Sequence, residues 1–170
     1  MHHVQGEASV VTPAELPSLL QELYKDTLAL FRARQANALS VAGYDANNGY
    51  QQVLGRQEVH LRWLADAIEQ SGGAVEEASH DGSGARRQKD AKAVIEGDVQ
   101  AQRAFLDRWS PRVESLTNAR NRKMVELVLG EMREHLRVLE LAARDRPDLL
   151  GRHADGRVLR GTVMPTRPKN

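Results

Sequence analysis

Hydrophobic residues recur every three or four positions over most of this chain, which is the spacing of one face of an α-helix. The first stripe predicts a helix over residues 13–42, with Thr12 as cap and Pro13 in the first turn. The stripe consists of Leu16, Leu19, Leu20, Leu23, Thr27, Leu30, Phe31 and Ala38. A second stripe predicts a helix over residues 50–70, after a turn at residues 43–49.

A loop of glycine, serine and acidic residues, 73–85, separates these two helices from the rest of the chain. The third helix is expected to start near Arg86. Ser110 and Pro111 are either the cap and first-turn proline of a new helix or a kink inside a longer one, because proline removes one helical hydrogen bond. The apolar stripe continues beyond them, so we expect the kinked continuation. The fourth helix is expected to end at Pro147. The pattern therefore predicts two pairs of helices around one long loop.

One motif occurs in both the second and the fourth predicted helix: Val-Leu-Gly, four residues, His-Leu-Arg, one residue, Leu. It covers residues 53–64 and, 75 positions later, 128–139, with seven of twelve residues identical, which predicts a duplicated helical hairpin. Helices of about 25 residues are roughly 38 Å long, and a 13-residue loop reaches roughly 43 Å. We therefore expect an all-α four-helix bundle of two antiparallel hairpins joined by a crossover loop. An up-down-up-down bundle is the alternative.

The composition excludes several classes of protein. Lysine and arginine number 24 against 23 acids, so no overall charge favours nucleic acid or membrane. The chain has no cysteine, which excludes disulfides, thiolate nucleophiles and cysteine-bound metal centres. Apolar stretches are too short to span a bilayer and the first residues do not resemble a signal peptide, so we expect a cytoplasmic protein.

The expected organisation is one bundle domain, residues 13–145, between an N-terminal tail, residues 1–12, and a C-terminal tail or docking arm, residues 146–170. Two short basic clusters, residues 86–89 and 120–123, contain no aromatic side chains. They are typical of solvated helix ends and not of a nucleic-acid site.

His60 and His135 occupy equivalent positions of the repeat. With the duplicated hairpin, the long loop, Gly72-Gly73 after the second helix and Gly97-Asp98 early in the third, they make residues 13–145 resemble the ferritin-like superfamily, in its rubrerythrin-like or uncharacterised four-helix-bundle form. Metal-containing members place Glu-x-x-His on helices two and four and one carboxylate on helices one and three. In this chain the residues three positions before the histidines are Gln57 and Met132.

Amide and thioether groups are poor bridging ligands for two iron or manganese ions, which need anionic oxygen. The resemblance therefore implies a bundle without a working di-metal centre, and no cofactor is expected. The alternative is an iron or manganese oxidoreductase that resembles ferroxidases or rubrerythrins. Its nitrogen ligands would be His60 and His135, and its oxygen ligands Asp98, Glu131 and Asp26.

The two histidines also have a purely structural interpretation, in which their ring nitrogens bond a buried partner such as Gln57, Asp98 or Asp26. Two function classes follow: an oligomeric or partner-binding protein that uses its bundle faces and C-terminal arm, or the metal-binding oxidoreductase. Whether the chain is an enzyme is left open by the sequence.

The C-terminal residues 151–170 contain five basic residues and one acid, and their apolar content includes Val158-Leu159 and Val163-Met164. They are either a disordered end or a short arm that docks on a neighbouring subunit or another protein. Gly55 and Gly130, inside the repeat, destabilise a helix by about 1 kcal/mol each relative to alanine, and we expect a close helix approach at both.

Overall fold

A computed structural model describes residues 11–76 and 90–145 of the chain. These residues form four α-helices and one 3-10 helix, with a single isolated β-bridge between Val11 and Leu116. The elements are α1 (Leu16–Ala38), α2 (Tyr44–Gln70), α3 (Ala91–Trp109), η1 (Ser110–Ser115) and α4 (Ala119–Ala143). The expectation of an all-α four-helix bundle is confirmed.

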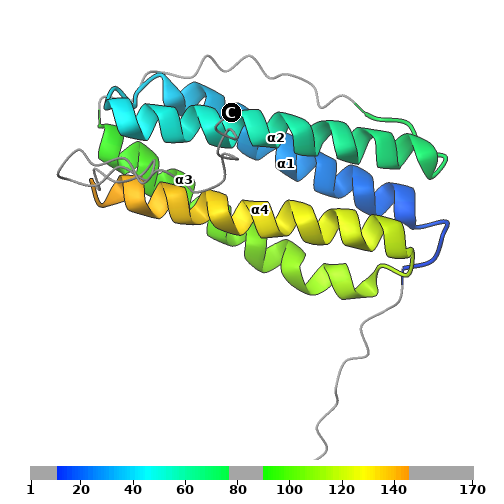
Figure 1. Cartoon of the computed structure of the whole chain (residues 1–170). Helices are drawn as coiled ribbons and strands as arrows, with labels where there is room; N and C mark the ends of the chain where they lie inside the picture. The colour runs from blue at the N-terminus through cyan, green and yellow to red at the C-terminus, as the bar shows by residue number, and fades with distance from the viewer. Residues whose placement is uncertain (1–10, 77–89, 146–170) are drawn as a thin grey trace, which may run out of the picture.

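Each helix packs against two others: α1 contacts α2 and α3, and α4 contacts α2 and α3 (Figure 1). The helices α1 and α3 run in opposite directions. Asn37, late in α1, bonds Asp98 early in α3, whereas the earlier Asp26 bonds Trp109 at the end of α3. The short turn after α1 makes α2 antiparallel to α1. Consequently α2 and α3 run in the same direction. The last turn of α2 and the first turn of α3 lie at opposite ends of the bundle (Figure 1).

The helix α2 begins at Tyr44, so the turn expected over residues 43–49 is wrong. Gly43 is its N-cap, and Asp45 in the first turn places a negative charge at the positive end of the helix dipole. The amide of Asn47 donates to the carbonyl of Val41 at 3.0 Å, which closes the end of α1. The local sequence resembles a loop, but its polar side chains serve as helix-end groups.

Other boundaries differ from expectation as well. The helix α1 spans Leu16–Ala38 and not residues 13–42, with Glu15 and not Thr12 as its N-cap, and α4 ends at Ala143 before Pro147 is reached. The helix α3 begins at Ala91 and not near Arg86, because the side chain of Asp90 accepts hydrogen bonds from the backbone of Lys92 and Ala93. After Trp109 the chain tightens into the 3-10 helix η1 and does not continue as a kinked α-helix.

The core consists of two apolar clusters at the two ends of the bundle. One includes Leu20, Leu64, Trp109 and Leu129, and the other includes Leu139. Six of the seven buried polar side chains in the described residues lie between these clusters or at the border of the second one, and we call them the polar layer: Arg34, Gln57, His60, Asp98, Gln102 and His135. A polar layer in the middle of a bundle is unusual, because buried polar groups destabilise a fold unless they are paired.

No helix in the described part of the chain is long and apolar enough to cross a membrane. The predicted tail or arm over residues 146–170 and the basic cluster at residues 86–89 lie outside the described residues.

Candidate functional site

The polar layer receives side chains from all four helices. Arg34 comes from α1, Gln57 and His60 from α2, Asp98 and Gln102 from α3, and His135 from α4. Four of the six have no exposed surface, and Asp98 and His135 are 4% and 6% exposed. The helical spacing of each stripe turns these residues inward together with the leucines before and after them.

His60 is one end of a hydrogen-bonded chain between α2 and α4. Its Nε2 lies 2.7 Å from Oε2 of Glu131. Glu131 also accepts two hydrogen bonds from Arg56, at 2.9 Å from Nε and 2.5 Å from Nη2. Because a carboxylate only accepts, the proton of a neutral His60 resides on Nε2 and its Nδ1 carries a lone pair. The ring of His60 stacks on that of His135 with centroids 5.7 Å apart.

Burial keeps both imidazoles uncharged near neutral pH. It lowers the pKa of His135 to about 3, with the neighbouring His60 and Arg34 acting in the same direction. Burial also lowers the pKa of His60, although its bond to Glu131 opposes the shift. The pKa of Glu131 is lowered first by its bond to Arg56, so this group is a carboxylate at neutral pH.

Arg34 supplies a fully buried guanidinium to the layer. Its Nη2 donates to Oε1 of Gln102 at 2.5 Å, and Nε2 of Gln102 donates to the backbone carbonyl of Met132 at 3.0 Å. Burial lowers the pKa of Arg34, while the charge of Asp98 raises it. This chain of bonds links α1, α3 and α4.

Asp98 is held by two donors from α1 and α2. The hydroxyl of Tyr50 donates to Oδ2 at 2.6 Å, and the amide of Asn37 donates to Oδ1 at 2.9 Å. Burial raises the pKa of Tyr50, and its bond to Asp98 adds to the shift, so Tyr50 acts as a neutral donor.

Several buried polar atoms have no hydrogen-bond partner among the described residues. In the polar layer they are Nε and Nη1 of Arg34, both amide atoms of Gln57, and Nδ1 of His60 and of His135. Folded proteins contain few such groups. Their concentration in one layer identifies it as the candidate functional site.

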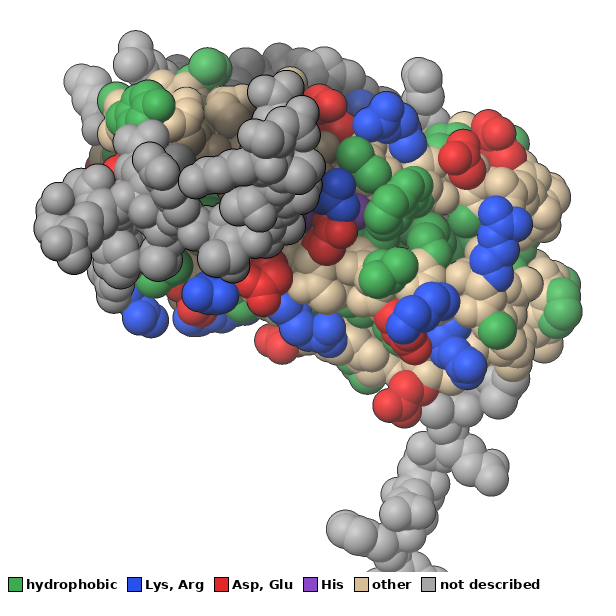
Figure 2. Space-filling view, viewed as in Figure 1, with side chains coloured by type: hydrophobic (Ala, Val, Ile, Leu, Met, Phe, Trp, Pro, Cys, Tyr) green, Lys and Arg blue, Asp and Glu red, His purple; other side chains and the backbone are tan. Residues whose placement is uncertain are grey.

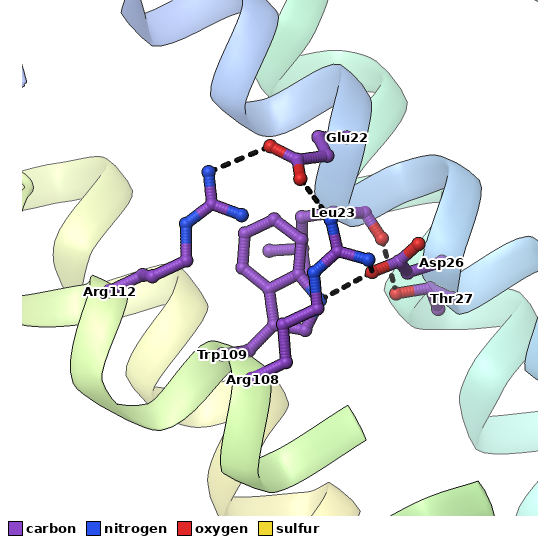
Figure 3. A network of polar contacts seen from close by, with 7 residues as sticks. All are labelled: Glu22, Leu23, Asp26, Thr27, Arg108, Trp109 and Arg112. Carbon is purple, nitrogen blue, oxygen red and sulfur yellow. Dashed lines mark hydrogen bonds and ion pairs between the residues drawn. The ribbon is translucent and has the colours of Figure 1, made fainter. Parts of the chain in front are cut away.

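The structure brings together some of the predicted ligands and separates others. His60, His135 and Glu131 are neighbours, although Glu131 contacts the histidine of α2 and not the one on its own helix. Asp98 lies in the polar layer. Asp26 does not: it accepts from Nε1 of Trp109 at 2.8 Å and pairs with Arg108 at 2.9 Å (Figure 3).

The surroundings of Asp26 form a separate network that joins α1 to α3 and η1. Arg108 and Arg112 both pair with Glu22, and they flank the buried ring of Trp109, whose centroid lies 4.3 Å from the guanidinium of Arg112 (Figure 3). These contacts explain Asp26 as a structural residue of this interface.

Sequence reasoning missed Arg34, Tyr50 and Asn37 as parts of the site. A signal existed for Arg34, which falls seven residues after Thr27 and four before Ala38, on the buried stripe of α1. Arginine within such a stripe is rarely buried without a partner, so its position was informative.

A second candidate site is a cleft of about 490 Å³ on the outer surface between the end of α2 and the start of α4. Trp63, Met124 and the half-exposed Leu127 provide its apolar lining. Asp66 lies on the α2 side and Arg120 and Lys123 lie on the α4 side. Figure 2 shows hydrophobic side chains gathered on this face over α2 and α4, with charged groups around them.

The glycines of the repeat do not mark close helix contacts. A Cβ added at Gly55 or Gly130 would meet nothing within 4 Å, so the expected close approach at both is wrong. The close approach occurs at Gly49, where a Cβ would lie 3.2 Å from Cγ1 of Val138.

No family model matches this chain, and comparisons with curated proteins and with solved structures found no match either. The assignment of function therefore depends on the residues and their geometry.

The donor set does not fit the two-metal centre that the ferritin-like resemblance implies. Met132 is fully buried in an apolar cluster, and Gln57 offers only an amide. Glu131 is already bound to Arg56, and no three histidine, aspartate or glutamate side chains among the described residues come together as a metal site. A buried guanidinium also lies in the layer, where its charge opposes a cation.

Proposed function

We propose that this chain is a ferritin-like helical bundle without a working di-metal centre and that it acts as an oligomeric protein through its outer faces. The observation that carries the first part is the buried guanidinium of Arg34 in the polar layer. It supplies inside the bundle the positive charge that a metal ion supplies in metal-containing members of this superfamily.

The charges in and beside the layer balance without any ion. Arg34 is opposed by Asp98, and Arg56 is paired with Glu131. The two imidazoles are neutral because burial lowers their pKa values. Two divalent cations would add charge that no remaining carboxylate offsets, which is unfavourable in a buried site.

The ferritin-like arrangement of hairpins and crossover is supported by the directions of the helices. Because α2 and α3 are parallel and α2 ends at the end of the bundle opposite to the start of α3, a connection along the bundle is required (Figure 1). Contacts between α2 and α4 also join equivalent positions of the repeat: Arg56 pairs with Glu131, and His60 stacks on His135, each 75 residues apart.

The cleft between α2 and α4 supports self-association. Its apolar lining includes Leu127, which is 50% exposed, and its two sides carry opposite charges. In a two-fold dimer, Asp66 of each copy would face Arg120 or Lys123 of the other, because an isologous interface pairs each side with its opposite. A second copy of this chain is therefore the occupant that we propose for the cleft.

The alternative oxidoreductase, with iron or manganese bound by His60, His135, Glu131, Asp98 and Asp26, receives less support. Asp26 is separated from the histidines and bonds Trp109, and Glu131 is neutralised by Arg56.

The test is the mass of the native protein as a function of concentration. We expect an oligomer for the unmodified chain and a shift toward monomer for Leu127→Asp, because a charge in the apolar cleft opposes its burial. The matched control is Leu39→Asp, since Leu39 is also exposed, at 70%, but lies on another face. A monomer at all concentrations, or equal assembly of both variants, would contradict the proposed oligomeric function.

A further inference from the structure

A groove of about 690 Å³ runs between α1 and α2 beside the turn that joins them. Phe31, Val41 and Leu54 are among the apolar residues that line it, with the exposed Leu39 beside them. Gly55 also borders the groove, and because a Cβ at this position would meet nothing within 4 Å, the groove is open there.

The groove carries one negative charge on an otherwise apolar and amide surface. Among the described residues that line it, Glu58 alone is charged, and the other polar lining residues are amides such as Gln35 and Gln51. An occupant with apolar side chains and positive charge would match this surface.

The chain leaves α4 close to this groove. Ala38 and Val41 line the groove, and on their inner side they belong to the apolar cluster that contains Leu139 and Ala142 from the last turns of α4. The residues that follow α4 therefore start at the same end of the bundle as the groove.

We propose that residues 146–164 of the same chain fold back and occupy the groove between α1 and α2. This segment carries three apolar pairs, Leu149-Leu150, Val158-Leu159 and Val163-Met164. Its basic residues are Arg146, Arg152, Arg157 and Arg160, against two acids, which complements Glu58.

The segment is long enough to reach along the whole groove. Val158 lies thirteen positions after Asp145, which allows roughly 45 Å of extended chain. The α1 side of the groove, from Phe31 to Ala38, is only about 11 Å long at 1.5 Å per residue. A tethered segment also has a high effective concentration at a site near its point of attachment, which favours its own chain over a second one.

Trypsin cleavage of the full chain at Arg157 and Arg160 tests this proposal. We expect cleavage at least tenfold slower than in a free peptide of residues 146–170, because docking removes these sites from the protease. The substitution Gly55→Trp fills the groove and is expected to restore the rate of the peptide. Gly130→Trp is the matched control: it alters the equivalent glycine of the repeat, which is also open but lies on α4, and it should leave protection unchanged.

A disulfide experiment identifies which chain supplies the segment. The chain contains no cysteine, so Leu39→Cys combined with Leu159→Cys provides a single defined pair. We expect oxidation to give a crosslinked monomer. Cleavage at the rate of the peptide in the unmodified chain, protection that Gly55→Trp does not reduce, or a crosslinked dimer would each overturn the proposal. These outcomes do not depend on Leu127, so they are distinct from a failure of the proposed oligomer.

Discussion

The rings of His60 and His135 stack with their centroids 5.7 Å apart and an angle of 27° between their planes. The two residues are 75 positions apart in the chain and occupy the same place in the repeated motif. The two rings contact each other by stacking, and the hydrogen bond of His60 is to Glu131 on the other helix, α4. The repeat thus brings two neutral imidazoles together at the centre of the bundle.

The depressed pKa values of the histidines predict a loss of stability in mild acid. The folded pKa of His135 is about 3, whereas an unfolded histidine has a pKa near 6.5, so the unfolded chain binds more protons between these values. The free energy of unfolding should therefore be highest above pH 6.5 and fall as the pH drops below it. His135 alone contributes a loss of about 2 kcal/mol by pH 5.

Urea unfolding at pH 7 and at pH 5 measures this effect. In His135→Gln the difference between the two pH values should shrink by about 2 kcal/mol, because the titrating group is absent. An unchanged pH dependence in this variant would show that His135 titrates normally in the folded chain.

Removal of the buried cation should destabilise the bundle more than removal of a surface cation. Arg34→Met leaves Asp98 without a nearby positive charge, and we expect a loss of about 3 kcal/mol. Adding Asp98→Asn should recover part of this loss, so that the two effects are not additive. Arg103→Met is the control, because Arg103 forms an exposed pair with Glu140 and such pairs contribute about 0–1 kcal/mol. Additive effects of the substitutions at positions 34 and 98 would mean that the two charges are not coupled.

Metal uptake distinguishes the proposed bundle from the oxidoreductase. Elemental analysis of untagged protein is expected to find far less than two equivalents of iron or manganese per chain, because Gln57 and Met132 occupy the positions at which the ferritin-like resemblance would require bridging carboxylates. Gln57→Glu with Met132→Glu should still not reach two equivalents while Arg34 is present, whereas adding Arg34→Glu should raise manganese uptake. Close to two bound ions in the unmodified protein would support the oxidoreductase instead.

The glycines provide a matched test of helix packing. Gly130→Ala should stabilise the chain by roughly 0.5–1 kcal/mol, because the added Cβ meets nothing and alanine favours the helix. Gly49→Ala should gain less or lose stability, because its Cβ would lie 3.2 Å from Cγ1 of Val138. Thermal unfolding of both variants measures the difference, and equal gains would show that Val138 moves aside without penalty.

Much of the fold was predictable from the sequence because helix formation depends on local spacing. The apolar stripes predicted four helices, and the two histidines could be placed together because a repeat puts equivalent residues on equivalent faces. The errors were at helix ends. Asp45 and Asn47 look like turn residues, yet they lie in the first turn of α2, where Asp45 places a negative charge at the positive end of the helix dipole and Asn47 donates to the carbonyl of Val41.

The tertiary structure decided which of these residues interact. The sequence shows Asp98 and Asp26 as similar acids, but their partners come from other helices: Tyr50 and Asn37 for Asp98, Trp109 for Asp26. Spacing along one helix predicts which face a residue occupies, and it carries no information about the level at which another helix lies beside it. The burial of Arg34 in the polar layer depends on that level, and so does the balance of charge that argues against a metal centre.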